Sequence, residues 1–186
     1  VGTYYFERGG MPRGRDVVYD REGAPIREAK PEQVAVDRVR DADVFFTTGI
    51  TPALSDRLVE TTGSLLRTAS DAGARTAFDV NYREKLWTPA EARETLADLF
   101  PAVDVLFAAE RDARTVLGFD GDAEAIGDEI AAEFDFETVV ITRGEKGELA
   151  RNGGTTTEQG TFPADTVDPL GSGDAFASGF LAERLD

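Results

Sequence analysis

The sequence contains neither cysteine nor histidine. The absence of cysteine excludes disulfide bonds and thiol nucleophiles, and the absence of both excludes the common Cys/His zinc sites. The absence of histidine also excludes catalytic triads of the Ser-His-Asp type. If the protein is an enzyme that needs a general base, that base must therefore be Asp, Glu, Lys or Tyr.

Positive charge is also scarce, because 36 acidic residues outnumber 20 basic ones and give a net charge of −16. Lysine occurs only as Lys30, Lys85 and Lys146. A surface of this sign repels nucleic acid and anionic membranes, so we expect neither as a partner. Since 41% of the residues are hydrophobic, the chain is expected to be globular rather than disordered. We interpret the acidic excess as adaptation to high salt, where a short Debye length screens the repulsion.

Long apolar runs are missing as well. No stretch approaches the length needed to cross a bilayer, and no signal-like segment opens the chain. The 186 residues are enough for one sizeable α/β domain with a small appendage. We therefore expect a soluble cytoplasmic protein.

The sequence pattern divides the chain into two regions. Residues 1–6 and 16–19 are short β-type runs on either side of a Gly/Pro/Arg-rich loop, which predicts a hairpin apart from the main core. From about residue 42, apolar strands alternate with amphipathic helices. Strands are predicted at residues 43–48, 75–80, 103–107 and 138–141. Helices are predicted in the stretch that ends at residue 72, in the stretch that begins at residue 88, and at residues 110–117 and 122–134. Beyond Gly147, short antiparallel strands and a last helix from about Gly173 are expected. This alternation predicts an α/β fold with a mainly parallel sheet that is covered on both faces.

In such sheets, ligands bind beyond the carboxyl ends of the strands. The segments in that position are 48–51, 81–85, 108–112, 142–147 and the glycine-rich entry to the last helix. We expect the functional residues among them.

The entry to the last helix carries the strongest motif, Asp-Pro-Leu-Gly-Ser-Gly-Asp-Ala-Phe at residues 168–176. Gly171 and Gly173 flank Ser172, and the missing Cβ atoms let an anion approach the backbone N–H groups at a helix N-terminus. Asp174 follows in the first helical turn. Its position alone fits a helix-stabilising acid as well as a catalytic one. The lack of histidine favours Asp174 as a base for a hydroxyl group that attacks a phosphoryl group.

Residues 168–180 resemble the DTxGAGDxFxxGF signature of PfkB-family (ribokinase-like) carbohydrate kinases. Pro169, Leu170 and Ser172 stand where Thr, a small apolar residue and Ala are usual. The resemblance implies a ribokinase-like three-layer α/β/α core at residues 31–186, with residues 1–30 contributing part of a small β lid and its connection. It further implies that Asp174 is the catalytic base and that Gly171, Ser172 and Gly173 form the anion hole.

The same resemblance implies ATP and Mg²⁺ as cofactors. Residues 140–147 resemble the strand and turn that border ATP in this family, so Thr142, Gly144 and Gly147 would line the nucleotide site. The family's Asn-x-x-Glu motif, which orders magnesium through water, corresponds here to Ala109 and Asp112. Asp112 is accordingly predicted to contact the metal indirectly.

Within the family, residues 19–23, 49–55 and 79–87 resemble segments of 2-keto-3-deoxygluconate kinases of Entner-Doudoroff type sugar-acid catabolism. This resemblance implies a sugar-acid substrate that is bound by Tyr4, Tyr19, Arg21, Ile50 and Arg83. Arginine suits the carboxylate of such a substrate because it can form two parallel hydrogen bonds to it. A homo-oligomer formed through the lid would also be in keeping with the family.

Two alternatives stay open. One is a PfkB kinase for a neutral sugar, such as fructose or ribose, or for a nucleoside; the other is a paralogue that binds nucleotide or sugar without transfer. A dinucleotide-dependent oxidoreductase and a P-loop enzyme are not supported, since neither G-x-G-x-x-G after a strand nor G-x-x-x-x-G-K-[ST] occurs. The aromatic residues Phe45, Phe46, Phe78, Phe107 and Trp87 are expected to pack in the core.

Overall fold

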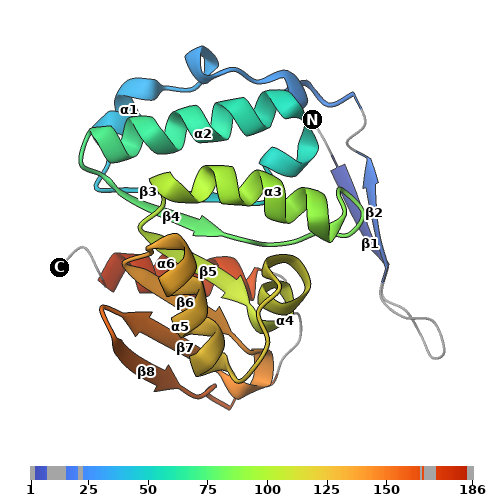
Figure 1. Cartoon of the computed structure of the whole chain (residues 1–186). Helices are drawn as coiled ribbons and strands as arrows, with labels where there is room; N and C mark the ends of the chain where they lie inside the picture. The colour runs from blue at the N-terminus through green and yellow to red at the C-terminus, as the bar shows by residue number, and fades with distance from the viewer. Residues whose placement is uncertain (1–2, 8–15, 21–22, 164, 166–170, 184–186) are drawn as a thin grey trace.

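The computed structural model in Figure 1 describes residues 3–7, 16–20, 23–163, 165 and 171–183. Strands β1 (Thr3–Glu7) and β2 (Asp16–Asp20) form an antiparallel pair that stands at one side of the main sheet. Their register places Tyr4 opposite Tyr19. The predicted hairpin is therefore confirmed.

The main sheet has six strands in the order β3-β4-β5-β6-β7-β8. Four parallel strands come first: β3 (Val44–Thr48), β4 (Arg75–Asp79), β5 (Val105–Ala109) and β6 (Thr138–Thr142). The last two, β7 (Glu148–Asn152) and β8 (Thr155–Gln159), continue the sheet antiparallel. The mainly parallel sheet and the antiparallel strands beyond Gly147 agree with the sequence pattern.

The helices that connect the parallel strands all lie on one face of this sheet, because right-handed crossovers between sequential neighbours always return on the same side (Figure 1). They are α2 (Asp56–Asp71), α3 (Pro89–Leu99), α5 (Ala123–Phe134) and the short α4 (Glu110–Asp112), which continues into a π-helical turn (Ala113–Leu117). The short α1 (Val36–Arg40) packs against α2. On the opposite face lies α6 (Ser172–Glu183), so helices occur on both faces as predicted. Single 3₁₀ turns complete the described chain at Pro25–Glu28, Pro31–Gln33, Pro52–Leu54, Phe100–Ala102 and Gly144–Lys146.

Side-chain caps explain where two of the helices begin. The N–H of Thr88 donates to Oε2 of Glu91 at 2.8 Å, and the N–H of Glu91 donates back to Oγ1 of Thr88 at 3.3 Å. This is the capping box that the sequence predicts, with Pro89 at the first helical position. Ser55 caps α2 in a similar way, by accepting a hydrogen bond from the N–H of Leu58 at 3.2 Å.

The larger core lies between the sheet and α2, α3 and α5. Phe100 is at its centre, with ring centroids 6.1 Å from Phe78, 4.9 Å from Phe134 and 5.1 Å from Phe136. Phe78 and Phe107 are fully buried, whereas Phe45, Phe46 and Trp87 are partly buried against the core clusters. The expected packing role of these aromatic residues is confirmed.

A smaller apolar cluster attaches α6 to the other face of the sheet. The ring of Phe107 on β5 meets Phe180 edge-to-face at 5.5 Å and Phe176 at 6.3 Å between centroids. Ala177 and Leu181 are buried in the same cluster. The cluster thereby fixes the first turn of α6 beside the carboxyl ends of β5 and β6.

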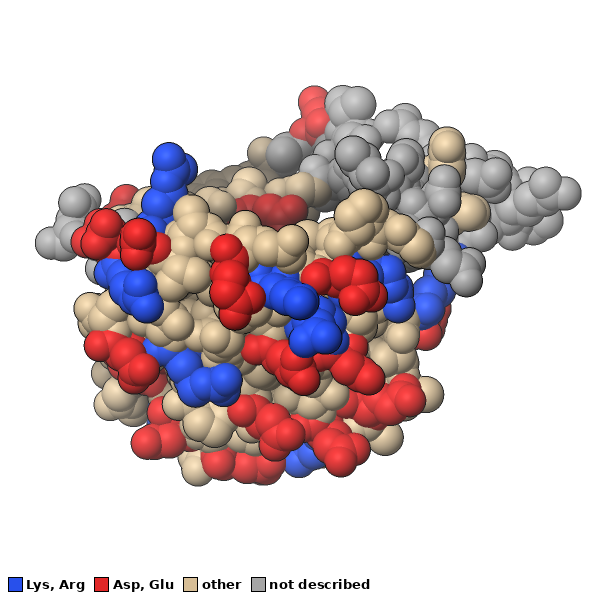
Figure 2. Space-filling view, turned by 90° about the horizontal axis from the view of Figure 1, so that it is seen from above, with Lys and Arg blue, Asp and Glu red and all other residues tan. Residues whose placement is uncertain are grey.

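The charge imbalance is visible on the surface. Figure 2 shows one face on which Asp and Glu side chains are interspersed with Arg and Lys side chains. Exposed ion pairs of the protein include Arg57 with Glu60 at 3.1 Å. Within the part of the chain that the structure describes, no helix is long and apolar enough to cross a membrane.

Candidate active site

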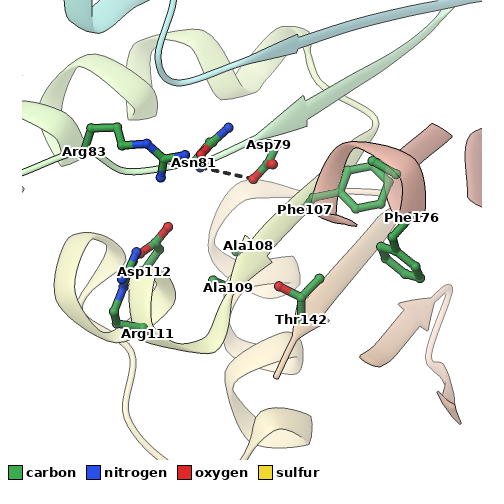
Figure 3. Close-up of a pocket in the computed structure, with 12 residues that line it drawn as sticks. Asp79, Asn81, Arg83, Phe107, Ala108, Ala109, Arg111, Asp112, Thr142 and Phe176 are labelled. Atoms are coloured by element: carbon green, nitrogen blue, oxygen red, sulfur yellow. Dashed lines mark hydrogen bonds and ion pairs between the residues drawn. The ribbon is translucent and has the colours of Figure 1, made fainter. Parts of the chain in front are cut away.

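A cavity of about 150 Å³ lies where the carboxyl ends of β4, β5 and β6 meet the first turns of α6 (Figure 3). We refer to it as the strand-end cavity. It is lined by Asp79, Asn81, Arg83, Phe107, Ala108, Ala109, Arg111, Asp112, Thr142, Gly173, Phe176 and Ala177. Four of the five segments that the sequence placed at this edge contribute to it. Polar side chains that are far apart in the sequence thus lie together at this edge of the parallel sheet.

Asp79 ends β4 at one wall of the cavity. Its Oδ1 accepts a hydrogen bond from the N–H of Asn81 at 3.1 Å, and Asn81 has a positive φ of 38°. Burial raises the pKa of the Asp79 carboxyl from 3.8 to about 6. The N–H of Asn81 lowers this pKa, the Asp112 charge raises it, Arg83 lowers it and Asp174 raises it, in decreasing order of effect. Asp79 is therefore a carboxyl group that can exchange a proton near neutral pH.

Asp112 is buried, and both of its carboxylate oxygens are engaged. Oδ2 accepts a hydrogen bond from the N–H of Tyr82 at 3.1 Å, and Oδ1 accepts one from Nε of Arg111 at 2.9 Å. The bond from Tyr82 joins the end of α4 to the loop after β4, and the bond from Arg111 lies within α4. Among the described residues, no group of three or more acidic side chains is arranged to hold a metal ion. An indirect contact of Asp112 with a metal stays a prediction.

Arg83 lines the cavity from the loop after β4, above Asp112 in Figure 3. Its Nη1 donates to the carbonyl oxygen of Tyr82 at 3.1 Å, which orients the guanidinium group. The hydroxyl group of Tyr82 donates to the carbonyl oxygen of Trp87 at 3.0 Å and so anchors the loop at its other end. Arg83 thus presents a positive charge to the cavity from a braced loop.

Ile50 belongs to the turn after β3, next to this loop. The N–H of Gly49 donates to the carbonyl oxygen of Asp79 at 2.8 Å, and a Cβ at position 49 would collide with the carbonyl oxygen of Val80. Only glycine fits this close approach. Ile50 itself is partly buried and does not line the strand-end cavity.

Thr142 lines the cavity from the end of β6, and Gly144 and Gly147 lie in the turn beyond it. Gly147 has a φ of +83°, and a Cβ there would collide with the carbonyl oxygen of Gln159. The N–H of Arg143 donates to the carbonyl oxygen of Gly147 at 2.9 Å and closes the turn. The three residues predicted to line the nucleotide site therefore lie at the end of β6 and in the closed turn that follows it. Of these three, only Thr142 lines the cavity.

The first turn of α6 forms the remaining wall. Gly171, Ser172, Gly173 and Asp174 are all exposed, and Gly173 lines the cavity. Gly171 has a φ of +79°, and its carbonyl oxygen accepts a hydrogen bond from the N–H of Ala175 at 2.9 Å. The charge of Asp174 is the smallest of the effects that raise the pKa of Asp79. Asp174 is accordingly outside the core and next to the open cavity.

Of the residues proposed from the sequence, the structure brings together Arg83, Asp112, Thr142 and Gly173 around one cavity, with Asp174 adjacent. Tyr4 and Tyr19 are placed only as paired positions of β1 and β2. Arg21 lies outside the described residues.

Three cavity residues were not singled out from the sequence: Asp79, Asn81 and Arg111. Each stands at or just after the carboxyl end of a parallel strand. That position was the signal that could have identified them.

Comparison with known proteins places this cavity in a family context. The sequence profile described as "pfkB family carbohydrate kinase" matches residues 2–186. The chain is 59% identical over 184 residues to a 2-dehydro-3-deoxygalactonokinase of Haloferax volcanii, covering 99% of this chain and 58% of that protein. It is 30% identical over 188 residues to a 2-dehydro-3-deoxygluconokinase of Thermoproteus tenax, covering 100% of this chain and 56% of that protein.

The fold agrees with a solved structure of the same kind. The crystal structure of a 2-dehydro-3-deoxygluconokinase from Thermotoga maritima superposes with a TM-score of 0.90 at 32% sequence identity, covering 100% of this chain and 61% of the other. The chain thus spans somewhat more than half the length of the relatives that it matches.

Proposed function

Because the chain belongs to the pfkB family of carbohydrate kinases, we propose that it transfers the γ-phosphoryl group of ATP to the terminal hydroxyl group of a 2-keto-3-deoxy sugar acid. The observation that carries this proposal is the strand-end cavity, which has Arg83 on one wall and Thr142 and Gly173 on another. The carboxylate of a sugar acid binds well to a cation, and the negative charge of a phosphoryl group is stabilised by backbone N–H groups. Both kinds of group line this one cavity.

Asp174 is the base in this proposal. It accepts the proton of the terminal hydroxyl group while that oxygen attacks the γ-phosphorus, and the bond to the β-phosphate oxygen breaks to release ADP. The backbone N–H groups of the turn at Gly171, Ser172 and Gly173 stabilise the negative charge on the transferred group. Arg83 holds the carboxylate of the sugar acid and so orients the hydroxyl group at the other end of the substrate.

Magnesium fits this site as a companion of ATP. The bound ion would neutralise phosphate charge during transfer. Asp112 already accepts hydrogen bonds at both oxygens, so the phosphate oxygens would supply most of the ligands. Asp79 and Asp112 are the cavity carboxylates that could reach the ion through water.

The identity of the sugar acid rests on the relatives. The motifs alone suggested 2-keto-3-deoxygluconate, whereas the 59% identity to a 2-dehydro-3-deoxygalactonokinase favours its C4 epimer, 2-keto-3-deoxygalactonate. We therefore expect both epimers to be phosphorylated, with the galactonate epimer preferred. Assembly through the β1–β2 hairpin stays a prediction.

The test is a coupled assay of ADP formation with the intact protein, ATP and Mg²⁺. Each epimer is compared with fructose, ribose and a nucleoside. ADP formed only with a neutral sugar or a nucleoside would favour the first alternative. ATP binding without ADP formation from any acceptor would favour a non-catalytic paralogue.

A further inference from the structure

We propose that Arg111 binds the phosphate groups of the nucleotide directly and that Asp112 positions its guanidinium group for this contact. The inference rests on the proposed function for the presence of a nucleotide at this edge of the sheet. It adds a phosphate-binding residue that neither the glycine-rich turn nor the turn after β6 supplies.

The geometry of Arg111 supports this role. Arg111 follows the carboxyl end of β5 by two residues and lines the strand-end cavity together with Thr142 and Gly173. Its Nε donates to Oδ1 of Asp112 at 2.9 Å, and Nη2 lies 2.9 Å from the same oxygen. Within the described part of the chain, Nη1 has no hydrogen-bond partner. One edge of the guanidinium group is thus held while another can still bind an anion.

The exposure of the two side chains separates their roles. The Arg111 side chain is 72% exposed, whereas the Asp112 side chain is 3% exposed. The N–H of Tyr82 holds Oδ2 of Asp112 in place, so Oδ1 gives Arg111 a fixed acceptor. An arginine that is already oriented loses less conformational freedom when it binds a phosphate.

The cavity also needs positive charge at this wall. Its carboxylates are Asp79 and Asp112, and its second cation, Arg83, lies in the loop after β4. Arg111 instead follows β5 by two residues. The last residue of β5, Ala109, pairs with Thr142 of β6. Arg111 therefore lies toward the predicted nucleotide side, and Arg83 stays available for the sugar acid.

Few other groups at the end of β5 could neutralise phosphate. Ala109 has no polar side chain, and Asp112 is itself an anion whose oxygens accept hydrogen bonds from Tyr82 and Arg111. Cations from the turn after β6 lie close by, since Lys146 and Arg143 help to hold the pKa of Glu110 below its usual value, after the larger effect of its hydrogen bond with Arg114. Arg111 is thus one of several cations near this end of β5 in a protein with a net charge of −16.

The experiment measures nucleotide binding by isothermal titration calorimetry, with ADP and adenosine as probes. We expect Arg111→Ala to weaken ADP binding by about 10- to 100-fold, which is the usual effect of losing a charge-assisted hydrogen bond. Adenosine binding should change by less than about twofold, because adenosine has no phosphate for Arg111 to contact. Arg111→Lys should recover part of the affinity for ADP. Arg111→Gln, which can still donate to Asp112, should lose as much affinity as the alanine variant.

The matched control is Arg114→Ala on the following turn, where Arg114 binds Glu110 at 2.7 Å and does not line the cavity. Its affinity for ADP should equal that of the wild type. The inference is overturned if Arg111→Ala or Arg111→Gln binds ADP with the affinity of the wild type. It is also overturned if either variant loses affinity for ADP and for adenosine by the same factor.

The outcome is separable from that of the proposed function. If ADP binds with the expected loss in the Arg111 variants but no sugar acid is phosphorylated, the proposed substrate fails and the phosphate contact stands. If sugar acids are phosphorylated and the variants bind ADP normally, the proposed function stands and the role of Arg111 fails.

Discussion

Oδ2 of Asp112 accepts a hydrogen bond from the backbone N–H of Tyr82 at 3.1 Å. Asp112 is the last residue of α4 and Tyr82 lies in the loop after β4, so this one bond joins a helix and a loop at the edge of the sheet. Both residues are buried. The bond therefore holds α4, which carries Arg111, against the loop that carries Arg83.

Asp112→Ala should lower the free energy of unfolding by about 1–3 kcal/mol, because it leaves the buried N–H of Tyr82 without a partner. Asp112→Asn keeps an acceptor oxygen and should lose less. Urea unfolding at constant salt measures both variants. Glu110→Gln at the neighbouring, partly exposed position is the control, with an expected change below about 1 kcal/mol. Equal stability of the alanine variant and the wild type would contradict the structural role of this bond.

Asp174→Asn should lower kcat for the sugar acid by about 10²- to 10⁴-fold, which is the usual contribution of a general base. The KM for ATP should change little, because the substitution keeps the shape of the first turn of α6. Steady-state kinetics at saturating ATP provide the measurement. Glu183→Gln at the other end of α6 serves as the control for the loss of one negative charge. Near-normal turnover of Asp174→Asn would refute the assignment of Asp174 as the base.

Arg83→Ala should raise the KM for the sugar acid by about 10- to 100-fold, because a charge-assisted contact to its carboxylate is lost. Arg83→Lys keeps the charge without the planar donor pair and should give an intermediate value. Arg93→Ala is the control, since Arg93 pairs with Glu133 at 3.0 Å on the surface. An unchanged KM in Arg83→Ala would indicate a substrate without a carboxylate near this loop.

The contribution of Asp79 to the stability of the protein should fall as the pH rises through the range in which this carboxyl titrates. Burial raises the pKa of this carboxyl from 3.8 to about 6 in the folded state, so between these values the folded protein keeps a proton that the unfolded chain has released. The contribution of Asp79 to the free energy of unfolding therefore decreases with pH across this window, by up to about 3 kcal/mol.

Asp79→Asn removes this ionisation and should be more stable than the wild type above about pH 7, with the difference vanishing below about pH 4. Denaturant unfolding of both proteins over this pH range, at constant high salt, gives the comparison. Parallel curves for the two proteins would show that Asp79 does not titrate in this way.

Low salt should destabilise the protein because of its net charge of −16. The Debye length shortens from about 10 Å at 0.1 M to about 3 Å at 1 M salt, which screens repulsion between neighbouring carboxylates. Thermal unfolding followed by circular dichroism should give a Tm that rises with KCl concentration. A protein that is fully folded and equally stable in dilute buffer would contradict the interpretation of the acidic surface.

Much of the fold could be predicted from local patterns in the sequence. Alternating apolar runs located the strands, and Thr88 with Pro89 and Glu91 located the start of α3 because capping depends on only a few neighbouring residues. The short α1 (Val36–Arg40) was missed, since one helical turn with a single buried residue, Val39, has no readable periodicity. The π-helical turn at Ala113–Leu117 also has no signature in its composition.

The site was predictable in place but not in detail. The rule for strand ends indicated the edge of the sheet at which the strand-end cavity lies, and the glycine-rich motif indicated the first turn of α6. The burial of Asp112 and its bond to Tyr82 depend on the packing of two loops, which no local pattern encodes. The same holds for Asp79 and Arg111, whose contribution to the cavity follows from how β4 and β5 are aligned.

The position of α6 also bears on how the site is assembled during synthesis. All six strands of the main sheet and the helices between them precede α6 in the described chain, and α6 contributes Gly173 to the wall of the strand-end cavity. The ribosome therefore releases the sheet and its strand-end loops before the helix that forms the last wall of the strand-end cavity. Until Phe176 and Phe180 of a nascent chain pack onto Phe107, this wall is missing.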